Sequence, residues 1–187
     1  TTFAKDDSKI SDVLATCKKE NISNVELGSN HIYEKNFKKI IQQYNFRFLV
    51  HNYFPIPRKS FVVNIASLNK QIRTISIQHV KKAINFCKVT NSKLYTVHPG
   101  FLADPITASR TKNNYDFIWN NNNLNQNYDL AFNNMLSSLK KIVHFAKDKK
   151  VRVAIETEGS FKKKNLLLMQ KPNEYNKLFK YFKPNDL

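Results

Sequence analysis

Short apolar runs alternate with helical stripes along this chain. Four runs are rich in β-branched or aromatic residues and predict β-strands at Ile22–Glu26, Phe46–His51, Leu94–His98 and Val151–Glu156. Apolar residues at helical spacing predict helices before, between and after these strands. The stripes are Ile10, Val13, Leu14 and Cys17; Phe37, Ile40, Ile41 and Tyr44; Ile77, Val80, Ile84 and Cys87; and Phe132, Met135, Leu136, Leu139, Val143 and Ala146. A last helix is predicted to begin at Pro172, with Glu174 in its first turn, and to bury Tyr175, Leu178, Phe179 and Phe182.

This order predicts an α/β fold with a parallel sheet and right-handed crossovers, either an open doubly wound sheet or a (β/α) barrel. A closed barrel of eight units takes about 250 residues, and this chain has 187. We therefore expect residues 1–187 to form a single partial domain, truncated at both ends. Thr1-Thr2-Phe3 has the character of the tail of an earlier strand, and another strand is expected after Leu187. Unprotected sheet edges would limit stability or favour self-association.

The net charge of +17, from 31 Lys and Arg against 14 Asp and Glu, would attract phosphate backbones. The excess is mostly Lys, however, and it is spread over predicted helix surfaces such as Lys38-Lys39, Lys81-Lys82 and Lys140-Lys141. A solvated helix face explains such pairs without a ligand. Nucleic acid is therefore the less favoured partner.

Cys17 and Cys87 fall on apolar stripes, which favours small buried side chains over a disulfide or a zinc pair. No apolar run approaches the roughly 20 residues that cross a bilayer. We expect a cytoplasmic protein without a membrane partner, and the oligomeric state stays open.

Each predicted strand ends on a residue that binds metals or moves protons: Glu26, His51, His98 and Glu156. In parallel α/β barrels the catalytic residues lie at the carboxyl ends of the strands. A single histidine there is more often structural, but His51 and His98 occupy equivalent positions, which favours function. Glu156 ends an apolar strand, where a carboxylate needs a partner. These residues predict a site for a divalent metal ion such as zinc or manganese.

Two long loops follow His51 and His98, and loops of this length are usually functional lids or disordered segments. Tyr53 and Phe101 are candidates for lining a sugar pocket, although aromatic loop residues more often pack under their own loops. His31, His79 and His144 are interpreted as solvated residues.

The motifs at these sites resemble those of the xylose-isomerase-like barrel superfamily. In chain order they are His51-Asn52-Tyr53, Asn64-Ile65-Ala66-Ser67, His98-Pro99-Gly100 and Ile155-Glu156-Thr157-Glu158-Gly159. The resemblance extends from about Ser8 to Leu187 and implies an incomplete TIM-type barrel, about the first five β/α units of eight.

In nucleases of the endonuclease IV type, which are similar to this chain, residues matching His51, His98 and Glu156 bind zinc. In the related sugar epimerases the residue matching Glu156 is a metal ligand and an acid/base. The remaining ligands come from later strands, which this chain lacks. The segments Phe54–Pro57 and Leu167–Pro172 look most like those of sugar-phosphate isomerase/epimerase-like proteins.

Three functions stay open. The first is a metal-dependent sugar or sugar-phosphate isomerase or epimerase, in which an ion polarises the carbonyl and Glu156 moves the neighbouring proton through an enediolate. Glu26 and Glu158 would then contact a substrate hydroxyl or act as a second base. The second is an apurinic-site DNA repair nuclease of the endonuclease IV type, and the third is a truncated barrel without catalytic activity.

Overall fold

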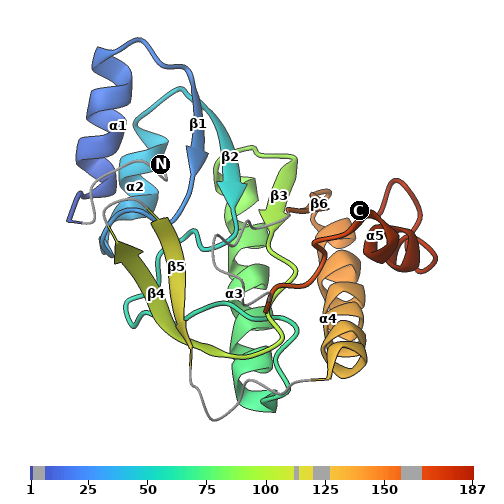
Figure 1. Cartoon of the computed structure of the whole chain (residues 1–187). Helices are drawn as coiled ribbons and strands as arrows, with labels where there is room; N and C mark the ends of the chain where they lie inside the picture. Colours follow the sequence, from blue (N-terminus) through green and yellow to red (C-terminus); the bar gives the residue numbers. More distant parts are fainter. Residues whose placement is uncertain (2–6, 112–113, 120–126, 157–165) are drawn as a thin grey trace.

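The computed structural model describes the chain except for residues 2–6, 112–113, 120–126 and 157–165, and it does not describe the side chains of 107–116. Helices and strands alternate as the sequence predicts, with one extra hairpin (Figure 1). The elements are α1 (Ile10–Lys19), β1 (Asn24–Leu27), α2 (Phe37–Gln42), β2 (Arg47–His51), α3 (Lys70–Val89), β3 (Leu94–Val97), β4 (Pro105–Thr111), β5 (Asn114–Trp119), α4 (Tyr128–Asp148), β6 (Arg152–Ile155) and α5 (Pro172–Leu178).

Four strands form one parallel sheet in the order β1-β2-β3-β6. Figure 1 shows their arrows pointing in the same direction, so that their carboxyl ends share one edge. The long helices α3 and α4 pack together, α3 against β2 and β3, and α4 against β6. The fold is therefore α/β with the strand order of part of a (β/α) barrel, and its four parallel strands are the four that the sequence predicts.

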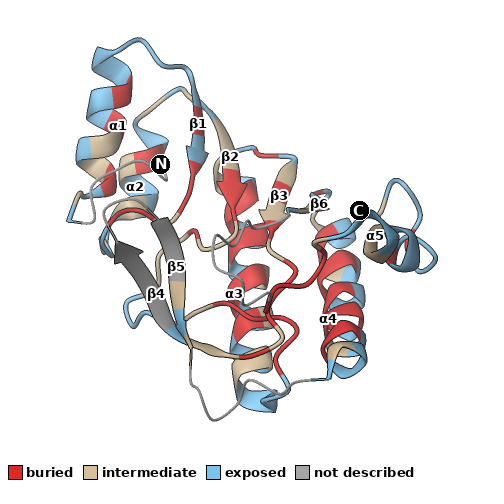
Figure 2. Ribbon diagram, in the orientation of Figure 1, coloured by how far each residue is buried: buried red, intermediate tan, exposed pale blue. Residues whose placement is uncertain are grey.

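The predicted helical stripes form the core. Figure 2 shows the buried face of α4 turned inward, and its stripe from Phe132 to Ala146 is buried. Cys17 and Cys87 are free and buried, as predicted. The last helix differs from the prediction: it ends at Leu178, and Phe179 is 51% exposed at its C-cap.

The polar stretch after His98, interpreted as a lid or a disordered segment, contains an antiparallel hairpin of β4 and β5. Its aromatic side chains hold it to the loop that follows β3. The ring of Phe101 lies 4.7 Å from that of Phe117 and 5.6 Å from that of Trp119. The hairpin is thus packed on the chain directly after His98.

The loops after β2 and β3 are joined through the side chain of Asn64. Its Oδ1 accepts hydrogen bonds from the backbone N–H groups of Ala66 and Phe101, at 3.1 and 3.0 Å. Its Nδ2 donates to Asp104 Oδ1 at 2.8 Å, and Asp104 Oδ2 accepts from the Ser67 hydroxyl at 2.8 Å. Asn64 is 1% exposed, and its bonds to the N–H groups of Ala66 and Phe101 are buried, so these two bonds are costly to lose.

Two histidines that the sequence analysis assigns to solvent are buried: His31 is 6% and His79 is 5% exposed, and only His144 lies at the surface. His79 lies on the inner face of α3, where its Nε2 is 3.1 Å from the carbonyl oxygen of Tyr53. The rings of Tyr53 and Phe61 pack on it. The loop after β2 is therefore supported by a buried, neutral imidazole.

Acidification is expected to destabilise the chain through His79. Burial lowers its pKa from 6.5 to about 4. Below pH 6.5 the unfolded chain therefore binds a proton that the folded chain refuses, and the free energy of unfolding falls until pH 4. At 1.36 kcal/mol for each pH unit, the loss is about 3 kcal/mol.

Urea unfolding at several pH values tests this. The His79→Gln variant keeps a donor for the Tyr53 carbonyl but cannot titrate, so its stability should fall less steeply from pH 6.5 to 4. His144→Gln, at an exposed position, is the control. Parallel curves for the wild type and His79→Gln would contradict the assignment.

Thr1 lies along the free edge of β1. Its backbone N contacts the carbonyl oxygen of Glu26, and its hydroxyl accepts from the N–H of Gly28 at 2.8 Å.

Among the described residues, no helix combines the length and the apolarity needed to cross a bilayer.

Candidate metal centre

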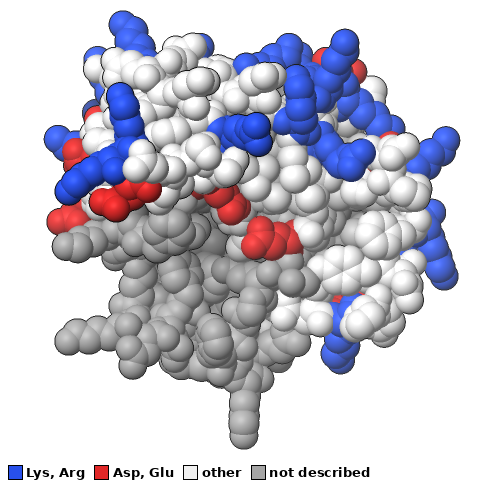
Figure 3. Space-filling model, turned by 90° about the horizontal axis from the view of Figure 1, so that it is seen from above, with Lys and Arg blue, Asp and Glu red and all other residues white. Residues whose placement is uncertain are grey.

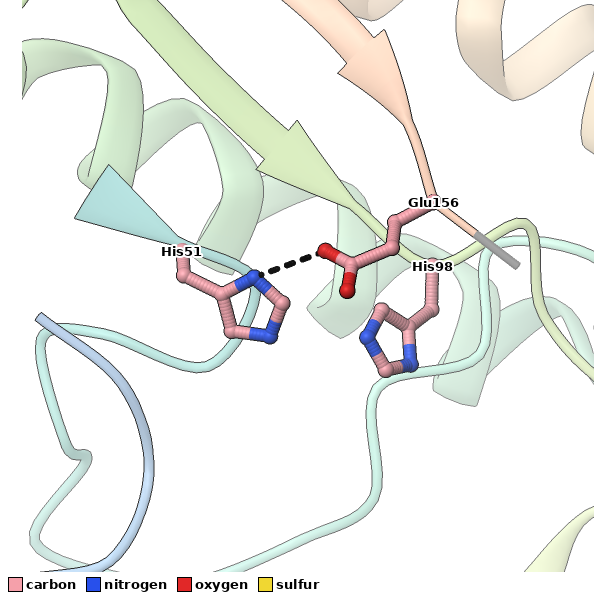
Figure 4. Close-up of side chains that lie close together, drawn as sticks. All are labelled: His51, His98 and Glu156. Carbon is pink, nitrogen blue, oxygen red and sulfur yellow. Dashed lines mark ion pairs between the residues drawn. The ribbon is translucent and has the colours of Figure 1, made fainter. Parts of the chain in front are cut away.

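Three of the four residues predicted at strand ends form a possible metal-binding group at the carboxyl edge of the sheet. His51 is the last residue of β2, and His98 and Glu156 directly follow β3 and β6. Each offers a ligand atom within 4.8 Å of those of the other two. Figure 4 shows the three side chains converging from neighbouring strands. The alignment of the strands in register thus brings together residues that are 105 positions apart, from 51 to 156.

His51 lies at the centre of the group and is 8% exposed. Its Nδ1 is 2.7 Å from Thr96 Oγ1 and 3.2 Å from a carboxylate oxygen of each of Glu26 and Glu156. Burial lowers the pKa of His51, His98 lowers it further, and the two carboxylates oppose the shift. The neutral imidazole, which is the form that binds metals, is therefore favoured.

His98 is fixed through its backbone. Its N–H donates to Asn52 Oδ1 at 3.4 Å, and its ring centroid lies 5.2 Å from that of His51 in an edge-to-face arrangement. Two residues later Gly100 adopts a φ of +107°, which brings the chain against Asn64 and Ala66. The geometry after β3 thus depends on the Asn64 network.

Glu156 carries the carboxylate of the group. Its side chain is 50% exposed, and its backbone N–H donates to the carbonyl of Val97 at 3.1 Å, which extends the pairing of β3 and β6. The partner that the sequence analysis requires for this carboxylate is His51. Half-exposure leaves Glu156 accessible to a ligand from solution.

Two imidazoles and one carboxylate fit a zinc ion or a similar divalent cation. Zinc binds such atoms at about 2.0–2.2 Å, so two ligands on one ion are at most about 4.4 Å apart. At the tetrahedral angle of zinc sites the spacing is about 3.4 Å, so atoms within 4.8 Å of one another would have to move closer to bind one ion. Three protein ligands also leave a position for substrate or water, as catalytic zinc sites do.

The remaining predicted site residues are placed differently. Tyr53 points under its own loop: its hydroxyl accepts from the N–H of Phe61 at 2.9 Å, and its ring packs on His79. Phe101 is 2% exposed within the hairpin cluster. Glu158 lies outside the described residues, and Glu26 contacts His51 on the β1 side. A substrate contact by any of these four stays a prediction.

Thr96, which is not among the residues predicted from the sequence, contacts the candidate ligand His51. Alternation along β3 places it on the same face as His98. Its position two residues before His98 in a predicted strand was therefore the sequence signal for this contact.

Comparisons with known proteins agree with this fold. Residues 14–178 match the family model described as xylose isomerase-like TIM barrel. A D-tagatose 3-epimerase-like protein superposes with a TM-score of 0.65 at 20% identity, covering 92% of this chain and 57% of that one. A D-psicose 3-epimerase from Clostridium cellulolyticum H10, solved with D-tagatose, gives a TM-score of 0.61 at 10% identity, covering 98% and 58%.

An uncharacterized protein of Methanocaldococcus jannaschii is 22% identical over 138 residues, which is 72% of this chain and 39% of that protein. The chain thus spans roughly two fifths to three fifths of the length of these relatives. The likeness to the solved structures shows the fold. The match of the family model over most of the sequence shows that this chain belongs to the xylose isomerase-like TIM barrel family.

Proposed function

We propose that this chain carries part of the active site of a metal-dependent sugar or sugar-phosphate isomerase or epimerase. The observation that carries the proposal is the convergence of His51, His98 and Glu156 at the carboxyl edge of the parallel sheet. Epimerases are among the structures that share its fold, and one of them was solved with D-tagatose.

In this proposal His51, His98 and the carboxylate of Glu156 would hold a divalent ion. The ion would supply Lewis acidity toward a substrate carbonyl. Glu156, being half-exposed, can reach substrate and would take the proton from the carbon next to that carbonyl. The electrons of the broken C–H bond move toward the carbonyl oxygen. Return of the proton by Glu156 to the neighbouring carbon would give the isomer, whereas the epimer requires a second acid that protonates the carbon from the other face.

Part of the basic charge has an explanation other than nucleic acid. Figure 3 views the molecule from the side on which the strands begin, opposite the edge that carries His51, His98 and Glu156, and many Lys and Arg side chains gather there. Helices α1, α3 and α4 have Lys18, Lys88 and Lys147 in their last turns, where positive charge complements the helix dipole. These lysines have a structural explanation and lie away from the proposed chemistry.

Metal titration tests the first part of the proposal. Metal-free protein titrated calorimetrically with zinc and with manganese should bind one ion. The His98→Ala and Glu156→Gln variants should each weaken binding by about 10²–10³-fold, since a structural zinc site gains about 10–16 kcal/mol from four ligands. His144→Ala, on the outer surface of α4, should bind as the wild type does. Equal affinity in all four proteins would contradict the ligand assignment.

Proton exchange tests the second part. The metal-loaded chain, incubated with D-tagatose or a ketose phosphate in heavy water, should incorporate deuterium next to the carbonyl, and Glu156→Gln should not. An abasic-site DNA duplex should stay intact under the same conditions. Cleavage of the duplex would overturn the proposal in favour of the nuclease, and metal binding without exchange would favour the non-catalytic barrel.

A further inference from the structure

The three oxygen atoms around one nitrogen of His51 call for an explanation. Thr96 Oγ1 lies 2.7 Å from Nδ1, and oxygens of Glu26 and Glu156 each lie 3.2 Å from it. A neutral imidazole has one N–H donor and one acceptor nitrogen. A nitrogen surrounded by carboxylates is best used as the donor, because a carboxylate can only accept.

The two carboxylates near this nitrogen are not equivalent. Glu156 belongs to the group of atoms that lie within 4.8 Å of one another, whereas Glu26 does not. Glu26 comes from β1, on the side of β2 away from β3 and β6, and therefore approaches the imidazole from the other side. A metal ligand role thus suits Glu156, and it leaves Glu26 and Thr96 as the oxygens that stay on Nδ1.

Figure 4 shows the other nitrogen of the His51 ring on the side of the His98 ring, while Nδ1 faces Glu156. Nδ1 is already crowded by Thr96 at 2.7 Å, in a side chain that is almost fully buried. The space for an ion therefore lies at Nε2.

We propose that Glu26 and Thr96 are positioning residues, which hold the proton of His51 on Nδ1 and so direct Nε2 to the metal. This proposal rests on the metal centre of the proposed function, but it concerns residues to which that function assigns no ligand role. In metal proteins the second nitrogen of a ligating histidine usually donates to a carboxylate or another oxygen, and loss of that acceptor costs about 10–100-fold in metal affinity.

The hydrogen bonds predict a graded series of variants. Glu26→Ala and Thr96→Val each remove an acceptor and should weaken zinc binding by about 10–100-fold. Glu26→Gln keeps an amide oxygen at the same reach and should recover most of the affinity. Glu20→Gln, on the exposed C-cap of α1, is the matched control and should change nothing. Circular dichroism must show the wild-type fold in each variant, because Glu26 and Thr96 lie in strands of the sheet.

Nitrogen-detected NMR of the histidine rings separates this proposal from the proposed function. At pH 8 and without metal, His51 should show a protonated Nδ1 and an unprotonated Nε2, and zinc should shift the signal of Nε2. A proton on Nε2 in the metal-free protein would overturn the proposal, as would a zinc shift at Nδ1 or unchanged affinity in both Glu26→Ala and Thr96→Val. If the wild type binds no zinc, the proposed function fails, while the metal-free spectrum still decides which nitrogen carries the proton.

Discussion

Zinc at a thousand times its dissociation constant is expected to raise the free energy of unfolding of this chain by about 4.1 kcal/mol. For a domain of this size that gain corresponds to a rise in melting temperature of roughly 8–16 °C. The reason is mass action: the ligand atoms of His51, His98 and Glu156 lie within 4.8 Å of one another only in the folded chain. Urea and thermal unfolding with and without zinc measure the gain.

The His51→Ala, His98→Ala double variant should show no gain from zinc, and His144→Ala should show the full gain. An equal rise in the double variant would place the zinc elsewhere in the chain.

The gain from zinc should also disappear on acidification, because protons compete for the imidazoles. Burial, assisted by His98, lowers the pKa of His51. His51 therefore stays neutral at pH values at which an ordinary histidine is already charged. Protonation of His51 weakens zinc binding only below about pH 6.5. Unfolding curves with and without zinc should show the added stability at pH 8 and a smaller increase at pH 5.

The positions of the candidate metal ligands were predictable because two simple rules coincide in this chain. Short β-branched runs mark parallel strands, and parallel strands that share a direction end at one edge. His51, His98 and Glu156 stand at or directly after the ends of their strands, so predicting the strands also located the residues. The pairing partners and the distances required the register of the sheet.

The hairpin was missed because its length and polarity suggested a loop. Yet aromatic residues recur at every second position, at Tyr115, Phe117 and Trp119, which is the period of a strand. The isolated hairpin could not have been placed from this pattern alone, since its packing depends on Phe101.

The burial of His79 had a signal in the helical period. Ser76, Val80, Ala83 and His79 all lie on the buried face of α3. The polarity of His79 suggested exposure to solvent, whereas its position on the helix predicted burial. Its hydrogen bond to the Tyr53 carbonyl satisfies the buried ring nitrogen. His31 had no such periodic signal, because it lies in the loop after β1.

Replacement of Gly100 by alanine is expected to destabilise the chain by about 4 kcal/mol. A φ of +107° is a conformation that side chains rarely adopt and costs about 1–3 kcal/mol. The new Cβ would also lie 2.6 Å from Asn64 Oδ1 and 2.9 Å from the Cβ of Ala66, and such overpacking costs about 1–3 kcal/mol more. Gly28, which is not among the residues with positive φ, is the control for the same substitution.

Because Gly100 follows His98 by two residues, its replacement should also disturb the metal centre. The nearest obstacle to the new Cβ is the Asn64 oxygen, which is fixed by the N–H groups of Ala66 and Phe101. Asn64→Ala removes that oxygen, at the cost of its own hydrogen bonds. The two substitutions should therefore be non-additive, with the double variant more stable than the sum of the single losses predicts.

Urea unfolding of the wild type, the two single variants and the double variant measures this non-additivity, and the zinc affinity of Gly100→Ala reports on His98. Strict additivity, or a Gly100→Ala variant as stable as Gly28→Ala, would show that the close approach of these two loops does not hold the site.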